Sequence, residues 1–165
     1  MPRSAGAVIH MKHHNNSIIV LKTDIPYELC KMAELSPLQP FSDDVTLFSN
    51  VLSKEINSDP RTRRYPDVAT FAFFCRKSNI NQLKKQYSNE DNIRLGRGLV
   101  FHVAPSNVPV NFAYSFLTGL LSGNCNIVKV PSKDFEQIDI ISEALHKISH
   151  MEVHPHVSER IKLVR

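Results

Sequence analysis

The sequence predicts an α/β fold in which a mostly helical segment precedes a parallel sheet with βαβαβ connectivity. From residue 98 onward, short apolar runs bounded by Gly or Pro alternate with helix-length stretches, and the connections between them are tight. Before that point, apolar residues recur at the three- and four-residue spacing of amphipathic helices. Hydrophobic residues make up 42% and charged residues 22% of the 165-residue chain, so a core can form.

The first 60 residues predict one strand, one short helix and one long amphipathic helix. Residues 17–22 read SIIVLK, which is typical of a strand, and the prolines within residues 24–40 favour a short helix with loops. The longer helix begins after Ser42 and ends at Asp59-Pro60. Its apolar stripe is formed by Val45, Phe48, Leu52 and Ile56.

Two more helices are predicted between residues 61 and 87. Pro66 suits the first turn of the first helix, and we expect Asn79 to end that helix before a polar one. The core-facing stripe of the first helix consists of Val68, Phe71, Phe74 and Cys75. A basic cluster before it fits either a solvated helix entry, which is favoured, or a phosphate patch. The cluster consists of Arg61, Arg63 and Arg64.

The second half predicts a strand, a helix, a strand, a helix and a strand. Their expected ranges are 98–103, 109–121, 126–130, 134–148 and 161–165. The first strand reads as buried on both faces, and Gly123-Asn124 suits the end of the first helix. This order implies a parallel sheet with right-handed crossovers. Ligands of such sheets bind at the carboxyl ends of the strands, so loops 104–109 and 131–134 form the candidate site.

The first of these loops, APSNVP, places Asn107 between two prolines. Because Pro105 and Pro109 restrict the backbone, the Asn107 side chain has little freedom left to lose. An amide fixed in this way is a good donor to a developing oxyanion, and Ser106 beside it is a candidate cofactor contact. An Asx-turn that only shapes the loop is the structural alternative for Asn107.

The second loop offers charges and a hydroxyl at the end of the next strand. In nucleotide-binding folds this position meets the adenine ribose, and a cation there accommodates the 2′-phosphate of NADP. Lys133 beside Ser132 suits a phosphate, and Lys129 ends the strand. The alternative is a solvated turn in which Ser132 or Asp134 caps the following helix.

Composition and charge argue against several classes of function. The formal net charge is only +4 and no Trp is present, so neither a dense basic stripe nor a base-stacking platform for nucleic acid is expected. No apolar run reaches the roughly 18 residues of a membrane span. The three cysteines are sparse and contain no CxxC motif, which favours a reducing, cytoplasmic setting.

The histidines and cysteines are candidates for metal binding and for nucleophilic catalysis, respectively. His146 and His150 lie four residues apart on a predicted helix and could share a zinc ion, but no further ligand is clearly placed, so no metal is expected. His154 and His156 follow them, and His10, His13 and His14 form a looser group. Cys75 and Cys125 both look structural, because neither has an obvious basic partner to lower its pKa.

The motifs APSNVPVNFAYSF and LLSGNCNIVKVPSKDF resemble the LuxC family of acyl-CoA reductases, which supplies fatty aldehyde to bacterial luciferase. YPDVATFAFFCRKSNI, upstream, resembles a helix of the same family. The family belongs to the aldehyde dehydrogenase superfamily, so the resemblance implies the N-terminal part of that fold, with a Rossmann-type sheet. The implied domains are a helical and strand segment over residues 1–60 and an incomplete NAD(P)-binding domain over residues 61–165.

The resemblance implies NADPH-dependent reduction of a long-chain fatty acyl-CoA, or of an acyl group from a donor protein, to an aldehyde. Asn107 matches the superfamily Asn that helps hold the thioester oxygen, and Ser132 matches the Ser near the adenine ribose. The superfamily Lys aligns with Val130, so either the strand is shifted at Lys129 or Lys133 takes part of its role.

None of the three cysteines matches the catalytic nucleophile. The chain is therefore expected to be a truncated, inactive part that lacks the catalytic domain. Its exposed sheet edges would favour association, for example as a homo-oligomer. A non-catalytic interaction module is the alternative.

Overall fold

The computed structural model describes residues 27–87, 92–151 and 154–164. Its centre is a three-stranded parallel sheet in the order β1-β2-β3. The strands are β1 (Leu99–Val103), β2 (Cys125–Lys129) and β3 (Ile161–Val164). In the pairing register Leu99 lies opposite Cys125 and Val103 opposite Lys129. A mixed helix and strand fold with a small parallel sheet is therefore confirmed.

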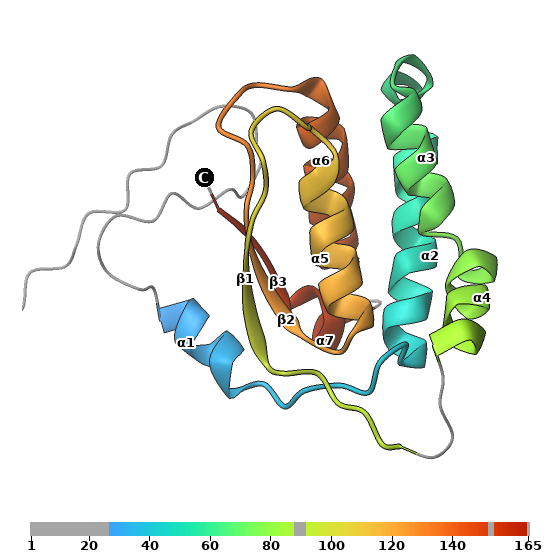
Figure 1. Ribbon diagram of the computed structural model, residues 1–165. Coiled ribbons are helices and arrows are strands. Elements are labelled where there is room, and N and C mark those ends of the chain that lie inside the picture. Colours follow the sequence, from blue (N-terminus) through green and yellow to red (C-terminus); the bar gives the residue numbers. More distant parts are fainter. Residues whose placement is uncertain (1–26, 88–91, 152–153, 165) are drawn as a thin grey trace, which may run out of the picture.

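Helices cover both faces of this sheet unequally (Figure 1). Between β1 and β2 runs α5 (Asn111–Leu121), and between β2 and β3 run α6 (Glu136–His150) and α7 (Pro155–Ser158). Figure 1 shows α5 and α6 on one side of the sheet, α2 and α3 beyond them, and α1 on the other side. The upstream elements are α1 (Tyr27–Glu34), α2 (Asp43–Ser58), η1 (Pro60–Arg64), α3 (Pro66–Phe74) and α4 (Lys77–Tyr87).

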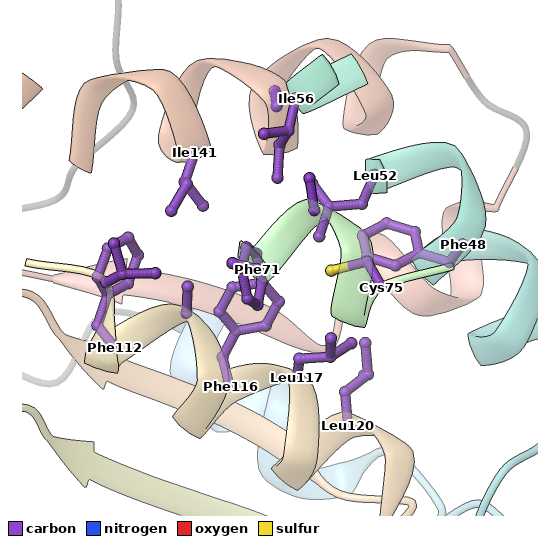
Figure 2. Close-up of a cluster of buried hydrophobic side chains, with 14 of the residues drawn as sticks. Phe48, Leu52, Ile56, Phe71, Cys75, Phe112, Phe116, Leu117, Leu120 and Ile141 are labelled. Carbon is purple, nitrogen blue, oxygen red and sulfur yellow. The ribbon is translucent and has the colours of Figure 1, made fainter. Parts of the chain in front are cut away.

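The main core lies where α2, α3, α5 and α6 meet (Figure 2). Phe71 of α3 is fully buried and packs edge-on against two rings of α5, with centroid distances of 5.0 Å to Tyr114 and 6.2 Å to Phe116. Such edge-to-face contacts add to the stabilisation from apolar burial. The predicted α2 stripe, Val45, Phe48, Leu52 and Ile56, faces this core in full.

Two serines allow α2 to approach α3 closely. Ser49 Oγ donates to the carbonyl oxygen of Cys75 at 2.7 Å, and Ser53 Oγ donates to that of Ala72 at 2.6 Å. Both serines are buried, so these bonds supply the partners that their hydroxyls would otherwise lack.

Gly123 ends α5 as the sequence predicts. Its φ of 87° is in the left-handed region, and its N–H donates to Leu120 O at 2.9 Å. The N–H of Asn124 donates to Gly119 O at 3.1 Å, which completes a Schellman motif. The carbonyl of Gly123 also accepts from the N–H of Leu38, so this turn anchors the segment that leads into α2.

Strand β1 differs from the prediction, because it is not buried on both faces. It lies at an edge of the described sheet, and Phe101 and Val103 are 56% and 68% exposed. The face that carries them is covered only farther along the sheet, where Leu29 and Met32 of α1 pack on β2. A continuous apolar run does not distinguish an edge strand from a central one.

The helix boundaries differ from the sequence prediction at Asn79 and agree with it elsewhere. Asn79 does not break the helix: it lies inside α4, and its Nδ2 donates to the carbonyl oxygen of Phe74 at 2.8 Å, so it caps the end of α3 from the next helix. Ser42 is the N-cap of α2 as expected, although its hydroxyl makes no capping bond. The predicted strand at 17–22 falls outside the described residues.

The arginine cluster is partly solvated, since Arg63 and Arg64 are exposed, and partly tied to α6 by ion pairs. Arg61 is only partly exposed and pairs with Asp59 at 2.6 Å and with Glu143 of α6 at 2.5 Å. Arg64 pairs with Glu136 of α6 at 2.8 Å. These pairs join η1 to α6, and their carboxylates offset much of the positive charge that a phosphate patch, the less favoured alternative, would need.

Candidate functional site

The two predicted site loops leave neighbouring strands at the same edge of the sheet. Strands β1 and β2 are parallel and in register, and the N–H of Ala104 still donates to Lys129 O at 3.4 Å. Beyond this bond each strand leads into a loop: residues 104–110 follow β1, and residues 130–135 follow β2. We call this the carboxyl edge.

Asn107 lies in an exposed turn of the first loop, next to Ser106. An Asx-turn would need an N–H two residues farther on, and that residue is Pro109, which has none. Within the described parts of the chain, no hydrogen bond of the Asn107 side chain is found. Its amide is therefore exposed and able to donate to a ligand.

The amino terminus of α5 opens at the same edge. The N-cap position is Val110, whose side chain cannot cap, and the first turn contains no acidic residue. The first N–H groups of a helix have no partners within it, and the helix dipole there favours an anion. In α5 the N–H groups of Asn111 and Ala113 already donate to Val108 O at 3.3 Å and to Val110 O at 3.0 Å, so the 11-residue helix adds mainly the positive end of its dipole to the loop that carries Asn107.

Ser132 and Lys133 are exposed in the second loop. The N-cap of α6 is Phe135, not Ser132 or Asp134 as the alternative interpretation expected. The Lys133 ammonium lies 5.2 Å from the Phe135 ring centroid, a cation–π distance that holds the charge near the loop.

Lys129 is the exposed last residue of β2. Side chains alternate along a strand, so it lies on the face of Cys125 and Ile127, opposite the face that packs on α5. The structure thus brings Asn107, Ser132 and Lys133 to one edge of the sheet.

A buried polar network below this edge was not anticipated. Asn126, fully buried in β2, accepts from His102 Nε2 at 2.9 Å and donates to Asn124 O at 3.0 Å. Gly119 of α5 lies directly over it: a Cβ there would be 2.0 Å from Asn126 Oδ1. An Asn in the middle of an otherwise apolar strand was the sequence signal, since such an amide must find partners.

The cysteines support no nucleophile, although one expectation about them was wrong. Arg160, which is buried, donates through Nη1 to Cys125 Sγ at 3.3 Å, so Cys125 does have a basic partner. Burial nevertheless raises the pKa of the Cys125 thiol, and the guanidinium only partly offsets this. Burial also raises the pKa of Cys75 far above its usual value. Cys30 is exposed on α1.

The histidines of α6 face one another without forming a metal cluster. The rings of His146 and His150 are 4.2 Å apart, and His150 Nδ1 donates to the carbonyl oxygen of His146 at 2.8 Å. Among the described residues, no group of three or more His, Cys, Asp or Glu could hold a metal ion. His10, His13 and His14 lie outside those residues.

In the portion that the structure covers, every helix is too short or too polar to cross a bilayer.

Comparisons with known proteins identify the family. Neither the curated proteins nor the solved structures contained a match to the chain. The family model described as "Acyl-CoA reductase (LuxC)" matches residues 76–163. This match begins after α3 and covers β1, β2 and β3 up to Leu163, with both loops of the carboxyl edge. It spans more than half of the chain, and the protein therefore belongs to the LuxC family of acyl-CoA reductases.

Proposed function

We propose that this chain supplies the NADPH half-site for reduction of a long-chain fatty acyl thioester to a fatty aldehyde. The acyl group would come from acyl-CoA or from an acyl-donor protein. The observation that carries the proposal is the placement of an exposed, unpaired amide and a hydroxyl-plus-ammonium pair on adjacent loops, Asn107 on one and Ser132 with Lys133 on the other.

The residues at this edge suit the chemical groups of NADPH. A serine hydroxyl and a lysine ammonium are donors to phosphate oxygens, so Ser132 and Lys133 would hold the 2′-phosphate and its ribose. The uncapped end of α5, with Ser106 before it, would face the remaining anionic part. Bound NADPH supplies a hydride donor.

Asn107 would act on the substrate. Reduction of a thioester places negative charge on the carbonyl oxygen, and a donor that is already fixed stabilises that charge without reorganising. Pro105 and Pro109 restrict the backbone on both sides of Asn107. Lys129, at the end of β2, would add positive charge near the cofactor.

The reduction of an acyl thioester also requires a cysteine thiolate that accepts the acyl group. Cys75 and Cys125 are buried with raised pKa values, and the carboxyl edge carries neither of them. We therefore propose that the chain by itself binds cofactor without turning over acyl-CoA. In this proposal residues 61–165 form the cofactor-binding part of an aldehyde dehydrogenase-like, Rossmann-type fold, preceded by an N-terminal segment over 1–60 whose helix α2 packs in the same core.

Calorimetric titration of the full chain with NADPH and with NADH tests the half-site. We expect NADPH to bind more tightly, and Lys133→Gln to remove about tenfold of its affinity while changing NADH binding little. Arg63→Gln is the matched control, since Arg63 is equally exposed but lies on η1. Failure of both nucleotides to bind, or an equal loss for NADPH and NADH, contradicts the proposal.

A second candidate is an interaction module without catalysis. The exposed apolar side chains Phe101 and Val103 on an edge strand favour it, because such edges pair readily with another chain. Sedimentation of the wild-type chain, compared with that of the Phe101→Lys variant, distinguishes the NADPH half-site from the interaction module. Concentration-dependent association that this charge abolishes, together with indifference to nucleotide, would support the module.

A further inference from the structure

A cavity of about 960 Å³ lies at the opposite end of the sheet from the proposed NADPH half-site. Gly96 and Asn124, which precede β1 and β2, form part of its wall, so it opens at the amino ends of the strands. Its other walls come from residues 40–41, the end of α4 and the last turn of α5. The size falls within the range of roughly 300–1,000 Å³ that is typical of small-molecule sites.

Most of the cavity lining is apolar. Phe41, Phe74, Leu83 and Leu121 contribute to its walls, and the Phe41 and Tyr87 rings stack with centroids 6.5 Å apart. At its mouth Ile93 is 89% exposed and Leu95 is 60% exposed. Neighbouring apolar side chains that remain in solvent around a hollow indicate a binding surface for an apolar group.

The charged residues that line the cavity within the described ranges are both arginines, Arg94 and Arg97. Arg94 is fixed at the mouth by a hydrogen bond from Nη1 to Tyr87 O at 3.1 Å, and its other N–H groups remain available. Arg97 donates through its backbone to Asn124, but within the described ranges no bond of its guanidinium is found. Among the lining residues that the structure describes, none carries a carboxylate. The charge therefore complements an anion attached to an apolar chain.

We propose that this cavity binds the anion of a free, single-chain fatty acid, with its chain against the apolar walls and its carboxylate at Arg97 and Arg94. A guanidinium matches a carboxylate in a bidentate geometry, and an apolar chain gains by leaving water. The site does not depend on the proposed cofactor function, because no residue is common to the two edges. A fatty acid anion in this cavity would bind at the opposite end of the sheet from the proposed site of thioester reduction.

Amide NMR of the isotope-labelled full chain during titration with decanoate tests this site. We expect saturable shifts at Gly96, Thr118 and Ser122, with about fourfold tighter binding for each methylene added to the acid. The neutral analogue 1-decanol should bind at least about tenfold more weakly, and Arg97→Gln should reduce decanoate affinity by a similar factor. Arg63→Gln is the matched control and should leave decanoate affinity unchanged.

A second variant, Thr118→Phe, fills the cavity from an exposed position on α5 and should block decanoate while the fold is kept. The proposal is wrong if decanoate gives no saturable shifts, if 1-decanol binds equally well, or if Arg97→Gln has no effect. Shifts confined to residues 104–107 and 131–133 would also overturn it, because decanoate would then occupy the carboxyl edge. A failure of NADPH binding leaves each of these outcomes unaffected.

Discussion

Replacing Gly119 with Ala tests the buried network beneath the carboxyl edge. Helix propensity alone predicts that Ala stabilises a helix by about 1 kcal/mol relative to Gly. The structure predicts the opposite sign, because the added Cβ would lie 2.0 Å from Asn126 Oδ1 and 3.0 Å from His102 Nε2. Asn126 is fully buried and held by two hydrogen bonds, so its amide cannot swing away cheaply.

The size of the effect follows from three contributions. Overpacking a well-filled site costs about 2 kcal/mol, and loss of the His102–Asn126 bond costs about 1 kcal/mol more. Subtracting the propensity gain leaves a net destabilisation of about 2 kcal/mol. For a chain of this length that corresponds to a fall in Tm of roughly 4–8 °C.

Urea unfolding followed by circular dichroism measures this free energy, because the chain has no Trp to report by fluorescence. The sharper test repeats Gly119→Ala in an Asn126→Ala background. There the clash with Asn126 is gone and His102, no longer bonded to Asn126, needs to shift only slightly, so Ala at position 119 should stabilise by up to about 1 kcal/mol. Stabilisation by Gly119→Ala in the wild-type chain, or the same destabilisation in both backgrounds, refutes the proposed packing.

The remaining predictions concern the core, an ion pair and the thiols. Phe71→Ala should cost about 3–5 kcal/mol in chemical unfolding, whereas Phe73→Ala, on the exposed side of α3, should cost under about 0.5 kcal/mol. Hydrogen bonding to Arg61 lowers the pKa of Asp59, so this pair stabilises above about pH 4 and its contribution is lost as pH falls further. The stability difference between wild type and Arg61→Gln should therefore shrink from about pH 5 to about pH 3, and a constant difference would contradict it. In a thiol-reagent assay Cys30 should react rapidly and the two buried cysteines only on unfolding; fast labelling of all three would show that the core is open.

Much of the architecture could be predicted because it depends on local patterns. The α2 stripe is spaced for one helix face, and all four of its residues are in the core. Gly123 was identified as a helix end because few other residues adopt its left-handed conformation at low cost. The parallel strands follow from tight alternation with helices, which leaves few other connections available.

The features that were missed depend on residues far apart in sequence. The α6 partners of Arg61 and Arg64 lie more than 70 residues away, so the sequence could not reveal that these arginines form ion pairs. Arg160 reaches Cys125 across 35 positions. The exposure of Phe101 depends on which elements cover the sheet, which an apolar run cannot indicate.

The loop sequences and the family resemblance together identify Asn107 and Ser132 as candidates. The parallel register places both loops at one edge, while their roles toward cofactor and substrate remain predictions. The cavity at the amino edge could not be found from sequence, because its walls come from five separate segments.

The most direct test of the carboxyl-edge site is an amide NMR titration of the isotope-labelled chain with NADPH. Saturable shifts confined to residues 104–107, 131–133 and the first turn of α5, reduced by Ser132→Ala, are the predicted result. No saturable shifts, or shifts centred on Gly96 and Thr118 at the other edge, would contradict it.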